Sequence, residues 1–245
     1  MEQTYAIELK NITKRFGKIV ANDGINLKVK RGEILSLLGE NGSGKTTLMN
    51  MISGIYFPDE GRILVDGKAV SIRSPKDSFD LGIGMIHQHF KLIDVMTAAE
   101  NIILGLKGNA VLDMKKVHKD IQELVDRYGF DLDPAQKVYT MSVSQKQTVE
   151  IVKMLYRGAN ILILDEPTAV LTPQEVDKLF EVLRNMRDDG RAIIIITHKL
   201  NEVLELSDRV AILRKGKYIG TLQTSEATVE SLTETVSYTH LTLPT

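Results

Sequence analysis

The sequence predicts an α/β fold organised around a phosphate-binding loop, and three observations predict it. Residues 39–46 fit the pattern G-x-x-x-x-G-K-[ST] between an apolar run and a segment with one apolar helical face. Apolar runs at 161–164 and 192–196 end in polar residues, as buried parallel strands do at a functional edge. Residues 6–30 alternate apolar and polar positions between glycines, which predicts short strands of a small antiparallel sheet.

The loop at residues 39–46 is the strongest single signal. Its glycines let backbone N–H groups wrap a polyphosphate, and the helix that follows adds its positive N-terminal end. Lys45 would reach the terminal phosphates, and the Thr46 hydroxyl would be a ligand of the accompanying Mg²⁺. The predicted nucleotide-binding residues are Gly39, Glu40, Asn41, Gly42, Ser43, Gly44, Lys45, Thr46 and Thr47.

Composition excludes several classes of protein. The 245 residues can bury a sizeable core, and the net charge of -1 provides no general field that attracts nucleic acid. The absence of cysteine excludes a disulfide framework and a thiolate site. No apolar stretch approaches the length of a membrane span, so a role at a membrane would come through a partner.

Residues 6–30 are expected to form short antiparallel strands. Phe16 lies among them, upstream of the phosphate loop. A lone phenylalanine more often packs in a core than stacks on a purine, so core packing is the first interpretation of this residue. The Asp66-Gly67 turn between residues 62–65 and 68–72 predicts a hairpin that extends the small sheet.

A helical insert is predicted in the middle of the chain. A short strand at 82–86 ends at His87, Gln88 and His89, and no further histidine or cysteine is spaced to complete a metal site. Residues 97–128 then show apolar positions at helical spacing, with Asp113 and Gly129 as caps.

Two carboxylates at the end of a buried strand indicate the chemistry. The run 161–164 delivers Asp165 and Glu166 to the carboxyl end of the sheet, where a pair of carboxylates is costly without a cation. With Mg²⁺-ATP bound, Asp165 would hold the metal and Glu166 would face the water that attacks the γ-phosphate.

Three further features complete the pattern. Ser142 and Gln145 have the spacing of a capping box, for a helix to about residue 156, and Thr172 with Glu175 forms a second one. The strand 192–196 ends at His198, which is expected to contact the γ-phosphate because its strand would neighbour that of Asp165. Runs at 210–213 and 218–222 predict a closing hairpin.

Taken together, these residues resemble the ATP-binding cassette of ABC transporters from residue 7 to about residue 235. Five motifs occur in the family's order: the phosphate loop, Gln88 as the Q-loop, residues 141–145 as the signature, residues 161–166 as the Walker-B strand with the catalytic glutamate, and His198 as the switch histidine. In addition, Phe16 falls where the family has its adenine-stacking aromatic residue, which favours stacking over core packing.

The resemblance implies a P-loop NTPase (RecA-like) cassette. A small β subdomain and the core would occupy about residues 1–90 and 150–235, with a helical subdomain at about 91–149. Glu166 would be the general base, His198 would hold the γ-phosphate and water in line, and Gln88 would contact Mg²⁺ or that water. The signature would complete the ATP site of a second cassette in trans, through Ser142, Val143, Ser144 and Gln145.

Within the family, the sequences of residues 87–90, 156–159 and 165–175 are most similar to those of the first cassette of double-cassette ATPases. These energise importers of simple sugars and nucleosides. The resemblance implies membrane permease subunits as partners at the cytoplasmic face, a second cassette, an extracytoplasmic substrate-binding protein acting indirectly, and no nucleic acid.

Three positions depart from the family pattern. Ser144 replaces a glycine, Thr148 stands where an arginine is common, and Thr172 replaces an aspartate. They leave open a regulatory cassette without turnover, and a soluble ABC ATPase that acts on ribosomes also stays open. Residues 236–245 resemble a translated sequencing adaptor, so we expect a non-native tail and a natural chain that continues into a second cassette.

Overall fold

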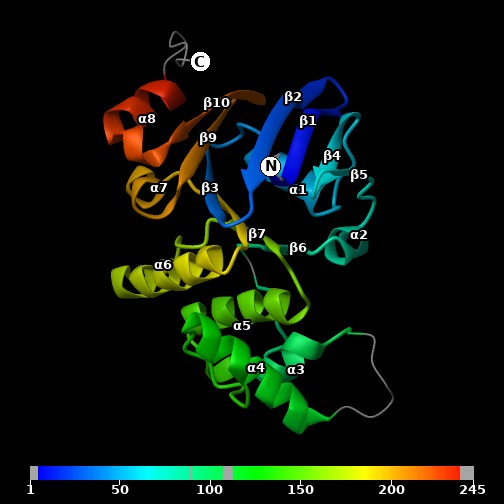
Figure 1. Cartoon of the computed structure of the whole chain (residues 1–245), viewed down its shortest axis with the longest axis vertical. Helices are drawn as coiled ribbons and strands as arrows, with labels where there is room; N and C mark the ends of the chain where they lie inside the picture. Colours follow the sequence, from blue (N-terminus) through cyan, green and yellow to red (C-terminus); the bar gives the residue numbers. More distant parts are fainter. Residues whose placement is uncertain (1–4, 89, 107–112, 238–245) are drawn as a thin grey trace.

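The computed structural model describes residues 5–88, 90–106 and 113–237, and it contains two sheets above a layer of helices (Figure 1). The smaller sheet is antiparallel, with strand order β2-β1-β4-β5. Its strands are β1 (Tyr5–Phe16), β2 (Ile19–Lys30), β4 (Glu60–Val65) and β5 (Lys68–Val70).

The larger sheet has the order β10-β9-β3-β8-β7-β6, and its strands are parallel except for the terminal β10. All its functional loops therefore leave from one edge, at the carboxyl ends of the parallel strands. These strands are β3 (Glu33–Leu38), β6 (Ile83–Ile86), β7 (Ile161–Asp165), β8 (Ala192–Ile196), β9 (Arg209–Arg214) and β10 (Lys217–Gln223).

Helices cover the large sheet on both faces. One apolar cluster joins α1 to both sheets, and a second joins the opposite face of the large sheet to α5 and α6. Burial on both faces explains why β8 is apolar throughout and why β3 is apolar except at Glu33 and Ser36. The helices are α1 (Lys45–Ile52), α2 (Pro75–Asp80), α3 (Ala98–Ile103), α4 (Met114–Tyr128), α5 (Val143–Tyr156), α6 (Pro173–Asp188), α7 (Leu200–Leu206) and α8 (Val229–Ser237).

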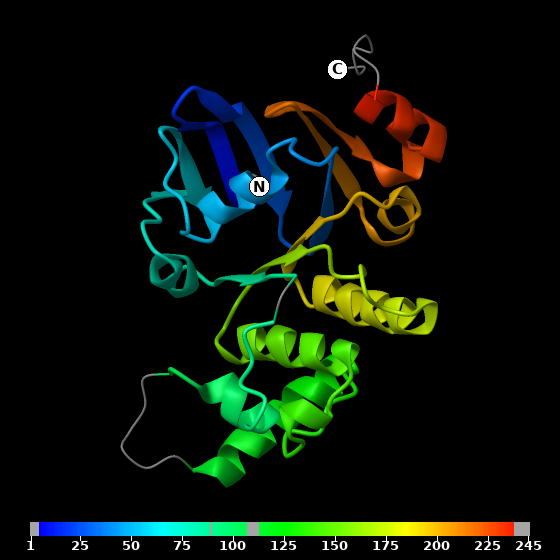
Figure 2. The ribbon, with the colours of Figure 1, turned by 180° about the vertical axis from the view of Figure 1, so that it is seen from behind.

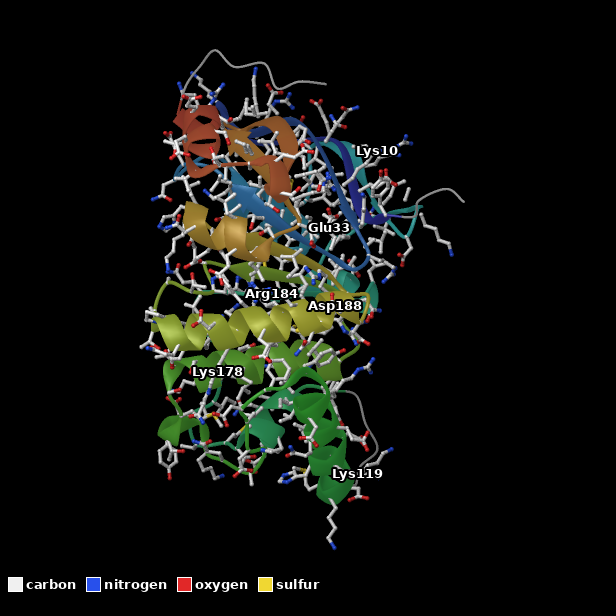
Figure 3. All side chains as sticks on the ribbon, turned by 60° about the vertical axis from the view of Figure 1, so that its left-hand side comes forward. Lys10, Glu33, Lys119, Lys178, Arg184 and Asp188 are labelled. Atoms are coloured by element: carbon white, nitrogen blue, oxygen red, sulfur yellow. The ribbon has the colours of Figure 1, made fainter. Side chains whose placement is uncertain are left out.

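The helical layer consists of α3, α4 and α5, which share an apolar core of their own. In Figure 3, the labelled Lys178, Arg184 and Asp188 mark α6, which runs between the strands and this layer, and Lys119 on α4 projects from its far end. Seen from behind, α2 lies on the side of the molecule opposite α7 and α8 (Figure 2). The expected boundary at residues 149 and 150 falls inside α5, which continues to Tyr156.

Local sequence signals explain the helix ends. Capping boxes are present at Ser142 with Gln145 and at Thr172 with Glu175, as predicted. Asp113 caps α4, and Gly129 ends it with a positive φ of 78°.

Two expectations about strands were wrong in detail. Residues 6–30 do not form short strands but one hairpin of two 12-residue strands, in which irregularities of register accommodate the twist. The second strand of the predicted 62–72 hairpin ends at Val70 rather than at residue 72. Within the described ranges, the helices include none long and apolar enough to cross a membrane.

Two sequence expectations concern residues that lie partly outside the described ranges. His89 and residues 238–245 of the expected tail are not described. The backbone of residues 236 and 237 belongs to α8.

Burial lowers the pKa of His87, which favours the neutral imidazole.

Candidate functional site

The phosphate loop connects β3 to α1, in the order that its pattern predicts. Two of its glycines are required by space, and one of these, Gly44, is required by conformation as well. A Cβ atom on Gly39 would lie 2.2 Å from the carbonyl oxygen of Leu213, and one on Gly44 would lie 2.4 Å from that of Ala21. Gly44 also has a φ of 97°, which residues with a side chain rarely adopt. The loop therefore lies directly against the backbone of two strands, β9 and β2.

Lys45 is buried within the loop. Its ammonium donates to the carbonyl oxygens of Gly39 at 2.7 Å and of Glu40 at 2.9 Å. Burial lowers the pKa of Lys45, while the nearby carboxylates of Glu166 and Asp165 oppose that shift. The cation at the start of α1 thus faces the two carboxylates predicted to share its site.

Asp165 is the last residue of β7, beside β8, and Glu166 follows it directly. Burial raises the pKa of Asp165, and the neighbouring charge of Glu166 raises it further. Glu166 Oε2 is buried and has no hydrogen-bond partner among the residues that the structure describes. Two carboxylates in this setting favour a bound cation, because a cation offsets both their burial and their mutual repulsion.

His198 lies beside Glu166, as the strand order requires. Asp165 pairs with Ile196 across β7 and β8, so the residues that follow the two strands emerge together. His198 Nδ1 and Glu166 Oε1 are 2.8 Å apart. The side chain of His198 is 60% exposed and that of Glu166 is 17% exposed, so the imidazole stands between the carboxylate and solvent.

One open cavity of about 720 Å³ brings together residues of three predicted motifs, but His198 is not among those that line it. It is lined by residues of the phosphate loop together with Gln88, Asp165 and Glu166. The other lining residues are Ile19, Val20, Ala21, Ile196, Lys215 and Gly216.

Sequence reasoning missed the contribution of one turn and of strand β2 to this cavity. Gly216 N donates to Ser43 O at 3.1 Å, and Asn22 Nδ2 donates to Gly44 O at 3.2 Å. The turn at Lys215-Gly216 was recognisable as a turn, but only the strand order brings it to the phosphate loop. Tertiary pairing, which no local pattern encodes, supplies this part of the site.

Phe16 lies at the end of β1 and is 43% exposed. Its ring packs edge-on against Tyr56, with the ring centroids 5.2 Å apart, and it is absent from the residues that line the cavity. Ile19 and Val20, which open β2 across the hairpin turn from Phe16, do line it. Phe16 is therefore next to the cavity and retains an exposed ring surface.

The signature segment lies elsewhere. Ser142 is the N-cap of α5, and Ser142, Ser144 and Gln145 line a different cavity, together with Glu175 of α6. Thr148 Oγ1 donates to Ser144 O at 3.1 Å within α5. The chain therefore presents a helix N-terminus apart from its own phosphate loop.

Comparison with known proteins identifies the family. A model of the family described as ABC transporter matches residues 22–169, more than half of the chain. The nucleoside import ATP-binding protein NupA of Lactococcus lactis subsp. cremoris is 49% identical over 96% of this chain and 47% of its own length. The guanosine import ATP-binding protein NupO of Bacillus subtilis is 52% identical over 93% of this chain and 45% of its own.

A solved structure agrees with these relatives. The cbiO1 protein of Clostridium perfringens, part of the ABC transporter complex cbiONQ, matches with a TM-score of 0.80 at 30% identity, over 91% of this chain and 90% of that one. The chain spans about half the length of the curated relatives it matches. The chain belongs to the ABC transporter family and has the fold of its ATPase cassettes.

Proposed function

We propose that this cassette binds and hydrolyses Mg²⁺-ATP and thereby energises an importer of nucleosides or simple sugars. The observation that carries the proposal is the arrangement of Lys45, Asp165 and Glu166 around one cavity, with His198 in contact with Glu166. Phosphoryl transfer to water requires a cation that binds the phosphates, carboxylates that bind a metal, and a base that an imidazole orients.

The residues at the site suit Mg²⁺. Thr46, Gln88 and Asp165 offer the oxygen ligands that this hard cation prefers, and all three line the cavity. Mg²⁺ usually takes few protein ligands, because phosphate oxygens and waters supply the rest. This fits the described residues, among which no three His, Cys, Asp or Glu side chains gather as a metal site. When bound, the metal neutralises charge on the phosphates.

Glu166 is the proposed general base. Its carboxylate is recessed in the cavity, and one oxygen without a partner is available to accept a proton from water. The contact with His198 holds the other oxygen, so the imidazole orients the base. With ATP bound, the same imidazole would contact the γ-phosphate. Phe16 and the apolar Ile19 and Val20 would receive the adenine.

A second cassette would complete the site. The signature residues Ser142, Val143, Ser144 and Gln145 start α5 away from this chain's own loop, and a helix N-terminus favours phosphate. The segment would therefore contact ATP held by a partner cassette. That partner would lie in the remaining length of a longer chain or in another chain, as the length of the relatives supports.

The membrane partner would dock through the helical layer. A groove between α2, β6 and α5 is lined by apolar and charged side chains, including Phe79, His87 and Arg157, close to Gln88. Permease subunits seated there would place this chain at the cytoplasmic face of the membrane. An extracytoplasmic binding protein would act only through them.

Nucleoside uptake tests this function. The chain, joined to the part of the Lactococcus lactis relative that it does not cover, would be expressed in a strain lacking that relative. Restored uptake of labelled nucleoside, lost in a Lys45→Ala variant of the same fusion, supports import. Restored uptake of ribose instead would assign the sugar branch. Co-purification with ribosomes and no uptake would favour the soluble ATPase and overturn the proposal.

A further inference from the structure

A buried hydrogen bond connects the signature helix to the residue after the proposed base. Gln147, on α5, is 4% exposed, and its Nε2 donates to the carbonyl oxygen of Pro167 at 3.0 Å. Pro167 directly follows Glu166. Removing this amide would leave the carbonyl without that partner in a buried setting, which is unfavourable.

A second set of bonds connects the same loop to the one that carries His198. Thr168 is 1% exposed, and its hydroxyl donates to Glu202 Oε2 at 2.6 Å. Lys199, directly after His198, donates from Nζ to Thr168 O at 3.1 Å and to Thr168 Oγ1 at 3.2 Å. The same ammonium is 2.9 Å from Glu202 Oε1. Thr168 is therefore held from both its backbone and its side chain.

The backbone of Glu166 needs such support. Its φ is 47°, in the left-handed region that residues with a side chain rarely occupy. Conformations of this kind persist where the surrounding structure fixes them, and they concentrate at functional sites. Glu166 N donates to Ile196 O at 2.9 Å, which fixes one end of the strained unit. The bonds to Pro167 and Thr168 fix the other.

We propose that Gln147 and Thr168 are positioning residues, which hold Glu166 in its strained conformation and in register with His198. The inference rests on the proposed function, in which Glu166 accepts the proton of the attacking water. Gln147 follows the signature by two residues, so a displacement of α5 by the partner's nucleotide would be transmitted to this chain's own base. Neither residue lines the phosphate-loop cavity, so ATP binding should not depend on them.

Thr168→Val tests the inference, because valine keeps the shape and removes the hydroxyl. ATP turnover is measured with the part of the Lactococcus lactis relative that this chain does not cover supplied. The ATP site of that part is inactivated by substitution, so that only this chain's site contributes. We expect kcat to fall about a hundredfold, the scale for misplaced catalytic groups, while KM stays within about twofold. Thr168→Ser, which retains the hydroxyl, should keep turnover near that of the parent chain. Gln147→Met supplies a second variant with the same expected separation of kcat from KM.

Two further variants make the result decisive. Ser78→Ala removes another buried hydroxyl, that of Ser78 on α2, which donates to Ile52 O at 3.0 Å. This variant should leave kcat unchanged. Glu166→Gln is the reference for the base. Collapse in Glu166→Gln with parental kcat in Thr168→Val and Gln147→Met would overturn the inference alone. Parental turnover in Glu166→Gln would overturn the proposed function and the inference together.

Discussion

His198 Nδ1 lies 2.8 Å from Glu166 Oε1, and the two residues emerge from the neighbouring parallel strands β8 and β7. Neither is near the other in sequence, and each depends on the strand order for its place. Their contact brings a group able to hold a phosphate oxygen next to a carboxylate with one free oxygen. The following predictions test this site and the elements around it.

Gly44→Ala should impair nucleotide binding through backbone overlap. Its Cβ would lie 2.4 Å from Ala21 O at a φ of 97°, so the loop would have to shift. We expect the Kd for a fluorescent ATP analogue to rise at least about tenfold, from the loss of one or more phosphate contacts. Gly67→Ala is the matched control, because its φ is 76° and nothing lies within 4 Å. Equal affinities in both variants would contradict the proposed cradle.

Phe16→Ala should weaken ATP binding by about tenfold, the scale of base stacking on an aromatic ring. The binding of tripolyphosphate, which has no base, should be unchanged. Isothermal titration of both ligands separates the two contributions. Phe57→Ala, at another exposed phenylalanine, should bind ATP as the parent chain does. An equal loss for both ligands would mean that Phe16 does not contact the base.

The comparison of sequence with structure shows what local patterns encode. The phosphate loop and the capping boxes at Ser142 and Thr172 were predictable, because each is fixed by residues within a few positions of one another. The twelve-residue length of β1 and β2 was not, because Gly24 reads as a break in the sequence but lies at an irregular position inside β2, where pairing with β1 keeps the strand together. The approach of Gly216 to the phosphate loop also depends on distant strand pairing.

The partner's site should respond to Ser144. In a Glu166→Gln background, remaining turnover would come from ATP on the second cassette, completed by this chain's signature. Ser144→Gly should raise it by about twofold to tenfold, which corresponds to one additional net hydrogen bond of roughly 0.5–1.5 kcal/mol. Ser144→Ala, which keeps the Cβ atom, should not reproduce the gain. No change in Ser144→Gly would show that the glycine position does not limit the trans contact.

Tyr128 should stabilise the junction between α4 and the end of α6. Its buried hydroxyl donates to Asp189 Oδ2 at 2.5 Å and accepts from Arg191 Nε at 3.1 Å. Tyr128→Phe should lower the free energy of unfolding by about 1–2 kcal/mol, measured with urea. Tyr139→Phe, at a residue that is 65% exposed, should change it little.

The effect of Tyr128→Phe should also depend on pH. The hydrogen bond from the Tyr128 hydroxyl lowers the pKa of Asp189 below its ordinary value, and the hydrogen bond from Arg127 lowers it further. A carboxyl group with a lowered pKa stabilises the folded state at pH values above the ordinary pKa of the group. That stability disappears as the pH falls through the lowered pKa. The difference between Tyr128→Phe and the parent chain should therefore shrink in acid. A constant difference down to full protonation of Asp189 would contradict this pairing.

The most direct test of the central claim is ATP turnover by Glu166→Gln beside the parent chain, each with the second cassette supplied and with Mg²⁺ present. Both should bind ATP with similar Kd, because the phosphate loop is intact in each. The catalytic loss in the variant should be about two to four orders of magnitude in turnover at this chain's site, the scale of a lost general base. Unchanged turnover at that site in the variant would show that Glu166 is not the base and would contradict the account.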